Sequence, residues 1–352
     1  MVIAHPVGDG SSIEIIGDLG SSSALVDCGG NDRAIEVLSH ASVRGMNEFV
    51  LTHPHLDHYS GVTLFPTGKK LSRDVDHVFI PALPLLGSEE ITFKFALALF
   101  ALNFMLGSKT GVAEKDLLDQ FVHMNPSGAN PKVSLLALGD SFNLSGRQLE
   151  VLWPPLRASG ILVQSVEEAI GAFENALQVD DMARKARDKV IVAAEEAAKG
   201  AASRAGHGDS GAEQPQLSDP VPEDEAKNIC EEPGLGFPVD VSDEVKAANE
   251  KIRSVANRLS LAFRSLGCFL HLGDLESYEL SAVVNNLGKS THYCSIVAAH
   301  HGTHFSARMS ALTARTLLVS NGPKRHVIDP GYLKIANMIQ ETYRQGHCFA
   351  FF

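Results

Sequence analysis

Short apolar runs bounded by glycine, proline and polar residues occupy both ends of the chain. Runs of this length, with many β-branched residues, predict buried β-strands. In the N-terminal half they predict strands at 13–16, 23–30, 47–53, 76–83, 133–140 and 147–155. In the C-terminal part they predict two strands within 260–274, joined by a turn near Gly267, and further strands at 294–302, 315–322 and 347–352.

Segments with apolar residues three or four positions apart predict amphipathic helices between these strands. The clearest stripe is formed by Val166, Ile170, Phe173 and Leu177. Further helices are predicted at 31–45, across most of 88–128, and at 242–259, 275–287, 306–314 and 330–345. Because strands dominate both ends and helices fill the region between them, we predict an α/β fold of layered sheets covered by helices.

The segment 160–250 differs in composition from the rest of the chain. The net charge is −12, and residues 161–250 contain 20 acidic and 8 basic residues, whereas the remainder contains 22 of each. All of the excess acidity therefore lies in this segment. Its part 200–228 is rich in Gly, Ser, Pro and acidic residues and almost free of large apolar ones, which predicts disorder. The net charge thus says little about what the rest of the chain binds.

The bulk composition is typical of a soluble globular protein, with 44% hydrophobic and 20% charged residues. The first ten residues lack a basic segment followed by an apolar one, so no secretory signal is expected. The most apolar stretch, 91–106, is shorter than a membrane-spanning helix and contains Lys94, which favours a buried helix or a lid over a cleft. Five cysteines without a CxxC pair argue against a disulfide framework or a zinc ribbon. These features favour a cytoplasmic protein without a membrane segment.

The strongest chemical signal is LTHPHLDHYSG at 51–61, which overlaps the end of a predicted strand. His53, His55, Asp57 and His58 are all able to bind a metal and fall within six positions. In an extended loop His53 and His55 point the same way and can reach one ion, whereas Asp57 and His58 suit a second ion close by. Two such ions can activate water and clamp the oxygens of a scissile ester. We therefore predict a metal site here.

With ALVDCGG (24–30) upstream, this HxHxDH motif resembles that of the metallo-β-lactamase fold. The resemblance implies a four-layer αββα sandwich with a dinuclear site at one edge, between two sheets, and a later Asp that bridges the metals. Two Gly-Asp pairs supply candidates for it, Asp140 and Asp274. Asp274 fits better, because it follows a predicted hairpin and lies 26 residues before His300, in the order that the fold requires. Asp140 is expected in a turn.

Six segments resemble, in order, parts of the hydrolase domain of ComEC-type competence proteins: VGDGSSIEI (7–15), LEVLWPP (149–155), NRLSLAF (257–263), FLHLGDLE (269–276), VAAHHGTHFS (297–306) and LLVSNG (317–322). Together the similar parts cover about 1–80, 131–158 and 253–352. The membrane domains of those proteins are absent from this sequence. The resemblance implies a freestanding single domain over 1–352, with a helical insertion at 82–130 and an acidic, partly disordered helical insertion at 160–250.

The resemblance also implies which residues act at the site. The implied metal ligands are His53 and His55 for one ion, Asp57, His58 and His300 for the second, and Asp274 as the bridge. The implied catalytic residues are Asp57, which also orients the attacking hydroxide, and His301 and His304, which with Ser306 bind substrate or protonate the leaving group.

The implied cofactors are two divalent metal ions. Zinc suits a site rich in imidazoles. Manganese stays open, because the further His that many members of the fold carry has only His77 and His123 as candidates here, and neither lies in a motif. Three other polar residues near the motifs are expected to be structural: Asp27 as a brace of the metal-binding loop, Cys28 as a buried thiol and His271 as a core residue.

Three functions are consistent with these residues. ComEC-type hydrolase domains are thought to be nucleases, which implies phosphodiester hydrolysis with nucleic acid as the substrate; yet KK (69–70) and PKR (323–325) are only small basic clusters, expected at the solvated surface. The second function is hydrolysis of small esters, lactones or thioesters, which the same metal core performs on related folds. The third is a non-enzymatic module that binds a protein partner through 160–250.

Overall fold

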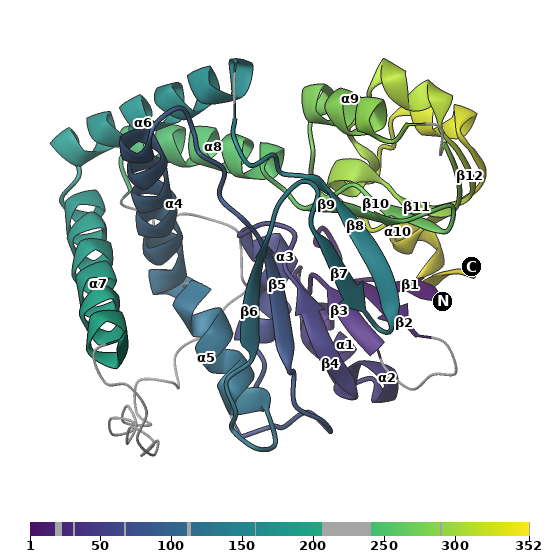
Figure 1. Ribbon diagram of the computed structural model, residues 1–352, viewed down its shortest axis with the longest axis horizontal. Helices are drawn as coiled ribbons and strands as arrows, with labels where there is room; N and C mark the ends of the chain where they lie inside the picture. Colours follow the sequence, from purple (N-terminus) through teal and green to yellow (C-terminus); the bar gives the residue numbers. More distant parts are fainter. Residues whose placement is uncertain are drawn as a thin grey trace.

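The computed structural model describes residues 1–17, 23–30, 32–66, 68–110, 114–158, 160–205, 241–288 and 291–351. In this part of the chain two mixed β-sheets face each other and helices lie outside them (Figure 1).

The first sheet is built mainly from the N-terminal part of the chain. Its strands are β1 (Val2–Ala4), β2 (Ile13–Ile16), β3 (Ser23–Val26), β4 (Met46–Val50), β5 (His77–Pro81), β6 (Lys132–Leu136) and β14 (Cys348–Ala350). Their order is β14-β1-β2-β3-β4-β5-β6, in which β3 to β6 run parallel and the other neighbours antiparallel. The β1–β14 pair brings the two ends of the described chain side by side (Figure 1).

The second sheet is built mainly from the C-terminal part. Its strands are β7 (Ser141–Leu144), β8 (Arg147–Trp153), β9 (Ala262–Ser265), β10 (Phe269–His271), β11 (His292–Val297), β12 (Thr313–Val319) and β13 (Ala336–Glu341). Their order is β13-β12-β11-β10-β9-β8-β7, in which β10 to β13 run parallel and the others antiparallel.

Helices connect these strands. They are α1 (Asp32–Val37), α2 (Ala41–Arg44), α3 (Leu56–Thr63), α4 (Glu89–Thr110), α5 (Glu114–Met124), α6 (Ile161–Val179), α7 (Asp181–Ala205), α8 (Asp243–Arg258), α9 (Ser277–Asn286) and α10 (Thr342–Gln345), with short 3₁₀ turns η3 (Ala299–Gly302), η4 (Ala307–Ala311) and η5 (Pro330–Lys334). Of the segment 200–228, for which disorder is predicted, residues 200–205 belong to α7, and 206–228 lie outside the described residues.

Three of the predicted elements are wrong in type. The helix predicted at 330–345 is interrupted by β13, whose hydrogen bonds to β12 extend the second sheet and outweigh local propensity. The helix predicted at 306–314 is only the 3₁₀ turn η4. The segment 141–144, predicted as part of a turn, is strand β7, paired with β8 in a hairpin.

Apolar side chains from both sheets form a shared core between them. Val26 and Val50 of the first sheet belong to the same buried cluster as Phe263 and Val297 of the second. A second cluster joins the outer face of the first sheet to α1, α3 and α5, and a third joins the outer face of the second sheet to α6, α8 and α9. The prediction of a mixed α/β chain with layered sheets and helices is confirmed, while the four-layer αββα type and the helical insertions stay predictions.

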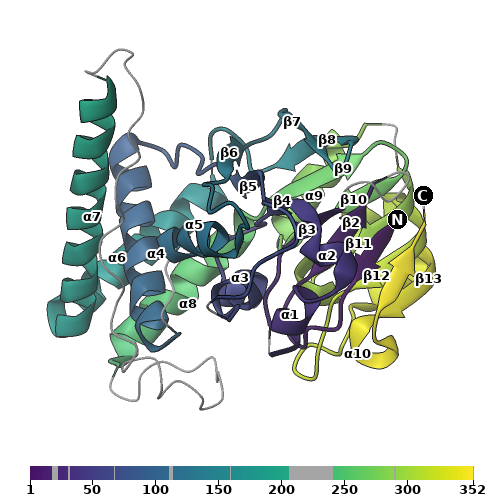
Figure 2. The same ribbon diagram turned by 90° about the horizontal axis from the view of Figure 1, so that it is seen from below.

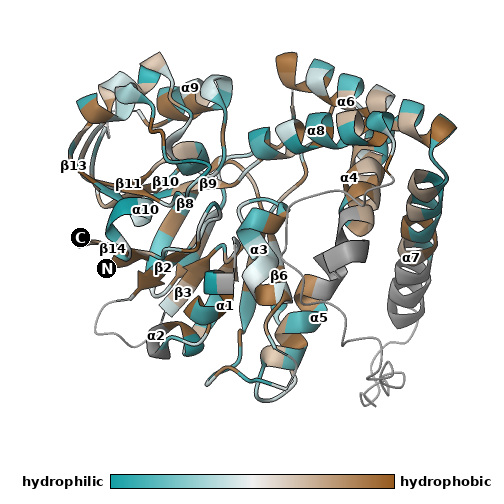
Figure 3. Cartoon of the chain, turned by 180° about the vertical axis from the view of Figure 1, so that it is seen from behind, coloured by the Kyte–Doolittle hydropathy of each residue, from teal (hydrophilic) through white to brown (hydrophobic). Residues whose placement is uncertain are grey.

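The helices of the two predicted insertions pack on one another. α4 from the first insertion lies beside α6, α7 and α8 from the second, at one side of the sheets (Figures 1 and 2). Lys94 of α4 forms an ion pair with Glu174 of α6, at 3.6 Å. Polar residues cover much of the described surface of α7 and α8 (Figure 3). The division of the chain into one domain with two insertions stays a prediction.

α4 contains the apolar stretch that predicts either a buried helix or a lid. Its Phe95, Ala98 and Leu102 are buried against the neighbouring helices, whereas Phe93 is 59% exposed. None of the helices within the described residues combines the length and apolarity needed to cross a membrane.

Candidate metal centre

The predicted ligands meet at the carboxyl ends of parallel strands from both sheets. His53 follows β4, Asp274 follows β10, and His300 and His301 follow β11 within the turn η3. His55 is the residue before α3, and the first turn of that helix carries the next two ligand candidates. The loop predicted for the whole motif therefore ends at residue 55, and helix α3 holds the rest.

The loop after β3 braces the metal-binding motif. Asp27 Oδ1 accepts a hydrogen bond from the Thr52 backbone N–H, and its Oδ2 accepts one from Thr52 Oγ1 and one from His58 Nδ1, each at 2.8 Å. Gly29 lies against the start of α3, where a Cβ would come within 2.2 Å of the Asp57 backbone carbonyl carbon. Only glycine allows this approach. Asp27 thus orients the His58 ring so that Nε2 faces the site, as carboxylates beside metal-binding histidines commonly do.

Asp274 lies at the centre of the cluster. Its Oδ2 is 3.4 Å from His58 Nε2, 3.7 Å from His301 Nε2, 3.8 Å from His300 Nε2 and 3.9 Å from His53 Nε2. A carboxylate oxygen surrounded by four imidazole nitrogens is well placed to be shared between two cations. The bridging role predicted for Asp274 stays a prediction that agrees with this geometry.

Two groups of side chains could each hold a metal ion. His53, His58 and Asp274 form one, Asp57, His58 and His301 form the other, and in each the ligand atoms lie within 4.8 Å of one another. Several of these buried atoms have no hydrogen-bond partner: His55 Nε2, Asp57 Oδ1, His58 Nε2 and His301 Nε2. Because buried polar atoms are rarely left without partners, so many unused donor atoms in one place fit a divalent metal.

His300 and His301 take different positions although they are adjacent. His301 is 3% exposed, its Nδ1 donates to the Ser320 backbone carbonyl at 2.7 Å, and its Nε2 is 3.8 Å from Asp57 Oδ2. His300 lies at the edge of the cluster, with Nδ1 2.8 Å from His304 Nδ1. Both histidines have positive φ, 47° and 57°. The structure therefore brings His301 into a metal-binding group and leaves His300 and His304 beside it.

The protonation of the cluster follows from burial and mutual charge. Burial, together with the charge of His58, holds the pKa of His53 well below its usual value, and burial together with Arg253 lowers that of His55 to about 3. Burial also lowers the pKa of His301 to about 4. These imidazoles are neutral near pH 7 and keep the lone pairs that a metal requires.

The acidic members of the cluster remain ionised. Burial alone would raise the pKa of Asp57, but His58 and Arg325 lower it on balance. His58 and His301 likewise outweigh burial at Asp274. Conversely, burial alone would lower the pKa of His58, but Asp27 and Asp274 raise it well above its usual value. A proton and a metal therefore compete for His58 Nε2.

A cavity of about 360 Å³ opens onto the cluster. Its lining combines site residues with one face of α8: His55, Asp57, Asn249, Glu250, Arg253, Ser254, Asn257, Asp274, Glu276, His300 and Arg325. Helix α8, which begins within the predicted acidic insertion and extends beyond it, thus forms a wall of the site, whereas α4 contributes no side chain to this lining.

Arg325 is a site residue that the sequence does not reveal. Its Nη1 donates to Asp57 Oδ2 at 2.8 Å and to the Asp9 backbone carbonyl at 3.1 Å. The prediction that the PKR cluster lies at the solvated surface is wrong for this residue, because the loop after β12 turns back over the metal-binding motif. Arg253 of α8 is the second guanidinium of the cavity and carries no motif either.

The remaining histidine candidates for the first metal lie outside both groups. His77 Nε2 is hydrogen bonded to Ser134 Oγ at 2.8 Å, and His123 is exposed in the last turn of α5. Asp140, the alternative bridging residue, instead closes the turn between β6 and β7, where its Oδ2 accepts the Ala137 backbone N–H at 2.8 Å. Ser306 caps the turn η4 through the Arg308 backbone N–H.

The sequence matches no protein-family model and no curated protein. Among solved structures, the chain is similar to Zn²⁺-bound PqqB from Methylobacterium extorquens, with 13% sequence identity and a TM-score of 0.25. The similar part covers 43% of this chain and 51% of PqqB, so the chain matches about half the length of that protein. So limited a likeness carries no argument about this chain, and the resemblance to ComEC-type domains stays a prediction.

Proposed function

We propose that the protein is a metal-dependent hydrolase with the four-layer αββα architecture of metallo-β-lactamases. One observation carries the proposal: the buried, unpartnered donor atoms of His55, Asp57, His58 and His301 occur together with Asp274 at a cavity lined by two guanidinium groups. Such a combination of metal ligands, open space and positive charge suits the hydrolysis of an anionic ester.

Six side chains are the proposed ligands of one or two divalent ions: His53, His55, Asp57, His58, Asp274 and His301. Zinc is the ion that this mixture of imidazoles and carboxylates suits best, with manganese as the alternative. When bound, such ions lower the pKa of water and neutralise negative charge that develops on the oxygens of the substrate. His301 is thus proposed as a ligand and no longer as a catalytic residue.

Arg253 and Arg325 are the proposed anion-binding residues. They reach the cavity from different elements, Arg253 from α8 and Arg325 from the loop after β12. A guanidinium has five N–H donors in a planar fork that matches the oxygens of a phosphate or carboxylate. Among the described residues Arg325 is bonded through Nη1, to Asp57 and to Asp9, and the contact holds the Asp57 carboxylate in a fixed position.

His300 and His304 are the proposed proton-transfer pair. Their Nδ1 atoms are 2.8 Å apart, so one nitrogen donates a hydrogen bond to the other. His300 also lines the cavity, where its Nε2 lies 3.8 Å from Asp274 Oδ2. From doubly protonated His300, the Nε2 proton can pass to a leaving-group oxygen in the cavity, and the Nδ1–H that remains donates a hydrogen bond to His304 Nδ1.

The proposed substrate class is a small phosphodiester. The volume of the cavity lies in the range of small-molecule sites, roughly 300–1,000 Å³. Glu250 and Glu276 line the same cavity as the two arginines. These carboxylates favour a substrate with one localised anionic group over a polyanion such as nucleic acid.

The test compares wild-type protein without an affinity tag with Asp274→Asn and, as a matched control, Asp140→Asn, which alters the other Gly-Asp pair. Bound Zn²⁺ and Mn²⁺ are counted by mass spectrometry. Hydrolysis is followed with bis(p-nitrophenyl) phosphate, p-nitrophenyl acetate and a single-stranded DNA oligonucleotide.

We expect wild type and Asp140→Asn to bind metal and hydrolyse the small phosphodiester. Asp274→Asn should lose bound metal and about 100-fold or more of kcat/KM. If only DNA or only the carboxylic ester were cleaved, the protein would still be a hydrolase, but the proposed substrate class would be wrong. Metal binding without hydrolysis of any of the three, or equal metal content in Asp274→Asn, would overturn the proposal.

A further inference from the structure

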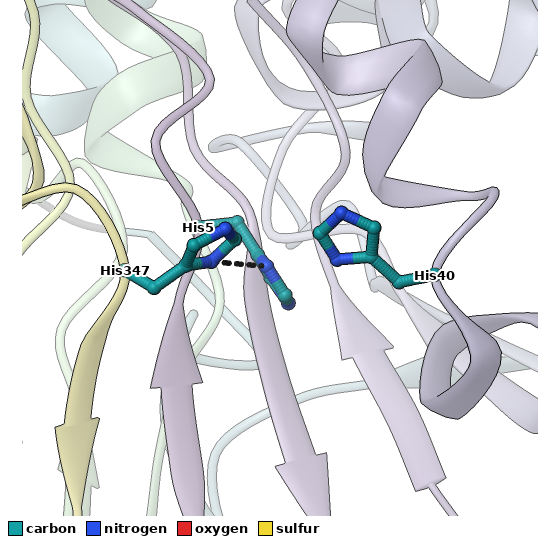
Figure 4. Close-up of side chains that lie close together, drawn as sticks. All are labelled: His5, His40 and His347. Carbon is teal, nitrogen blue, oxygen red and sulfur yellow. Dashed lines mark hydrogen bonds between the residues drawn. The ribbon is translucent and has the colours of Figure 1, made fainter.

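Three histidines gather at a second place, where the two ends of the described chain meet. His5 directly follows β1, His40 lies between α1 and α2, and His347 directly precedes β14 (Figure 4). Their ring nitrogens lie within 4.8 Å of one another. None of the three belongs to the site around Asp274, and no motif in the sequence marks them.

The sheet register brings two of these histidines together. β1 and β14 pair antiparallel with Ala4 opposite Cys348, which places the next residues, His5 and His347, beside each other. Their Nδ1 atoms are 3.2 Å apart. Two nitrogens bound to one tetrahedral zinc at about 2.0–2.1 Å would be separated by roughly 3.3 Å. The two rings therefore already have the spacing that a shared ion requires.

The ring of His5 is oriented by a buried carboxylate. His5 Nε2 is 3.1 Å from Glu14 Oε2, and the two side chains are only 2% and 1% exposed. Donation of Nε2–H to Glu14 leaves the lone pair on Nδ1, the atom that faces His347. A carboxylate, a histidine and a metal commonly line up in this way.

His40 is the third member of the cluster (Figure 4). The ring centroids of His5 and His40 are 5.6 Å apart, and those of His40 and His347 are 5.4 Å apart. Burial, followed by the nearby His5 and His40, lowers the pKa of His347, which keeps its lone pair available near pH 7. His347 is exposed, so water can reach a fourth coordination position.

We propose that His5, His40 and His347 form a second metal site, which binds a divalent transition ion of the zinc class and fastens β14 and the α1–α2 connection to β1. Three imidazoles with a carboxylate behind one of them suit zinc, copper or nickel better than magnesium or calcium, which prefer oxygen. Because the ion would join three segments far apart in the sequence, its binding would stabilise the folded chain. The proposal does not depend on the hydrolase site.

The test uses metal-free protein without an affinity tag, titrated with Zn²⁺ and with Co²⁺, whose visible absorption reports imidazole coordination. The variants are His347→Ala and His40→Gln. His292→Ala is the matched control, because His292 is also exposed but contacts only Thr313 Oγ1, at 2.9 Å, among the hydrogen bonds of the described chain. Asp274→Asn is included to weaken the first site.

We expect both cluster variants to bind one ion fewer per chain than wild type and to keep the hydrolysis rate. Zn²⁺ should raise the melting temperature of Asp274→Asn, whereas this rise should be smaller in Asp274→Asn/His347→Ala. Unchanged stoichiometry and unchanged Co²⁺ absorption in both cluster variants would overturn the proposal and leave the cluster as hydrogen-bonded histidines beside Glu14. Circular dichroism of each variant confirms that it is folded.

Discussion

The environment of His271 favours the neutral form of its ring. The side chain is 2% exposed and stacks on Phe263, with ring centroids 5.1 Å apart and planes inclined by 1°. Its Nδ1 accepts the Gly273 backbone N–H at 3.1 Å, and Gly273 directly precedes Asp274 of the metal cluster. Burial lowers the pKa of His271 to about 4, from 6.5. The expectation that it is a core residue agrees with this environment.

His271 should make the folded state sensitive to acid. Below pH 6.5 the unfolded chain takes up a proton at this residue, whereas the folded chain does not until the pH approaches 4. The unfolded state therefore binds more protons in this window, and the free energy of unfolding falls by about 2 to 3 kcal/mol between pH 7 and 4.5. In His271→Gln this part of the pH dependence should be absent, as urea unfolding at both pH values in the presence of EDTA would reveal.

Exposed His292, replaced by Gln, is the control for the loss of one imidazole. In His292→Gln the free energy of unfolding should change between the two pH values by as much as in wild type. If His271→Gln also kept the wild-type difference, the acid sensitivity would have to come from other groups of the cluster.

The sequence predicts ligand types better than it predicts which atoms point inward. HxHxDH after a strand is sufficient to expect a metal site, because the spacing alone places several donors in one short stretch. Spacing does not distinguish His300 from His301, since both adopt positive φ and the turn η3 decides which ring enters the cluster. Arg325 escapes prediction because only the path of the loop after β12 carries it to Asp57.

At the scale of elements, Arg258 holds helix α8, which lines the cavity, in place. Arg258, at the end of α8, donates through Nε to Glu279 Oε1 of α9 at 2.7 Å and through Nη1 to Ser165 Oγ of α6 at 2.6 Å. Its backbone carbonyl accepts the Trp153 indole N–H at 2.7 Å. α8 is thereby held to two helices and to strand β8.

Replacing Glu279 by Ala should destabilise the protein strongly. Glu279 is fully buried and Arg258 is 7% exposed, so the change leaves a buried guanidinium without its charge partner. Loss of one member of such a pair costs about 3–5 kcal/mol in the free energy of unfolding. Denaturant unfolding measures this cost.

The exposed ion pair of Lys246 with Asp243, at the start of the same helix, provides the comparison. Lys246→Ala should leave stability unchanged within error, because solvent screens such a pair. Equal effects of Glu279→Ala and Lys246→Ala would mean that the buried pair does not anchor α8.

Helices with a strong periodic pattern are the elements that the sequence predicts best. The helix predicted at 242–259 is α8, whose Ser242 side chain accepts the Val245 N–H as an N-cap. β13 is not predictable in this way, because its identity as a strand comes from hydrogen bonds to β12 and not from its own pattern of apolar residues.

At the scale of the whole molecule, the helices α4, α6, α7 and α8 pack onto the sheets that carry the site. α4, α6, α7 and α8 share one apolar core with the outer face of the second sheet. The composition predicts a loosely held stretch only at 200–228, and the helices on either side of it pack on the second sheet, where α8 also lines the cavity. The overall composition reflects the polar residues on the exposed faces of α7 and α8. The residues on the buried faces of α6 and α8 determine where these helices pack.

This arrangement predicts that the acidic stretch 206–240 can be replaced without loss of the site. The stretch contains nine acidic residues and one lysine. The flanking helices are fixed to each other without it: Asp180 Oδ1 accepts the Met182 and Ala183 backbone N–H groups at the start of α7, and Oδ2 accepts that of Ser242 before α8, at 3.3 Å. An equally long Gly/Ser linker should therefore keep metal content unchanged and kcat/KM within about twofold. A large fall in either quantity would place 206–240 in the working site, whereas lost binding of a protein partner with intact hydrolysis would assign it a separate interaction role.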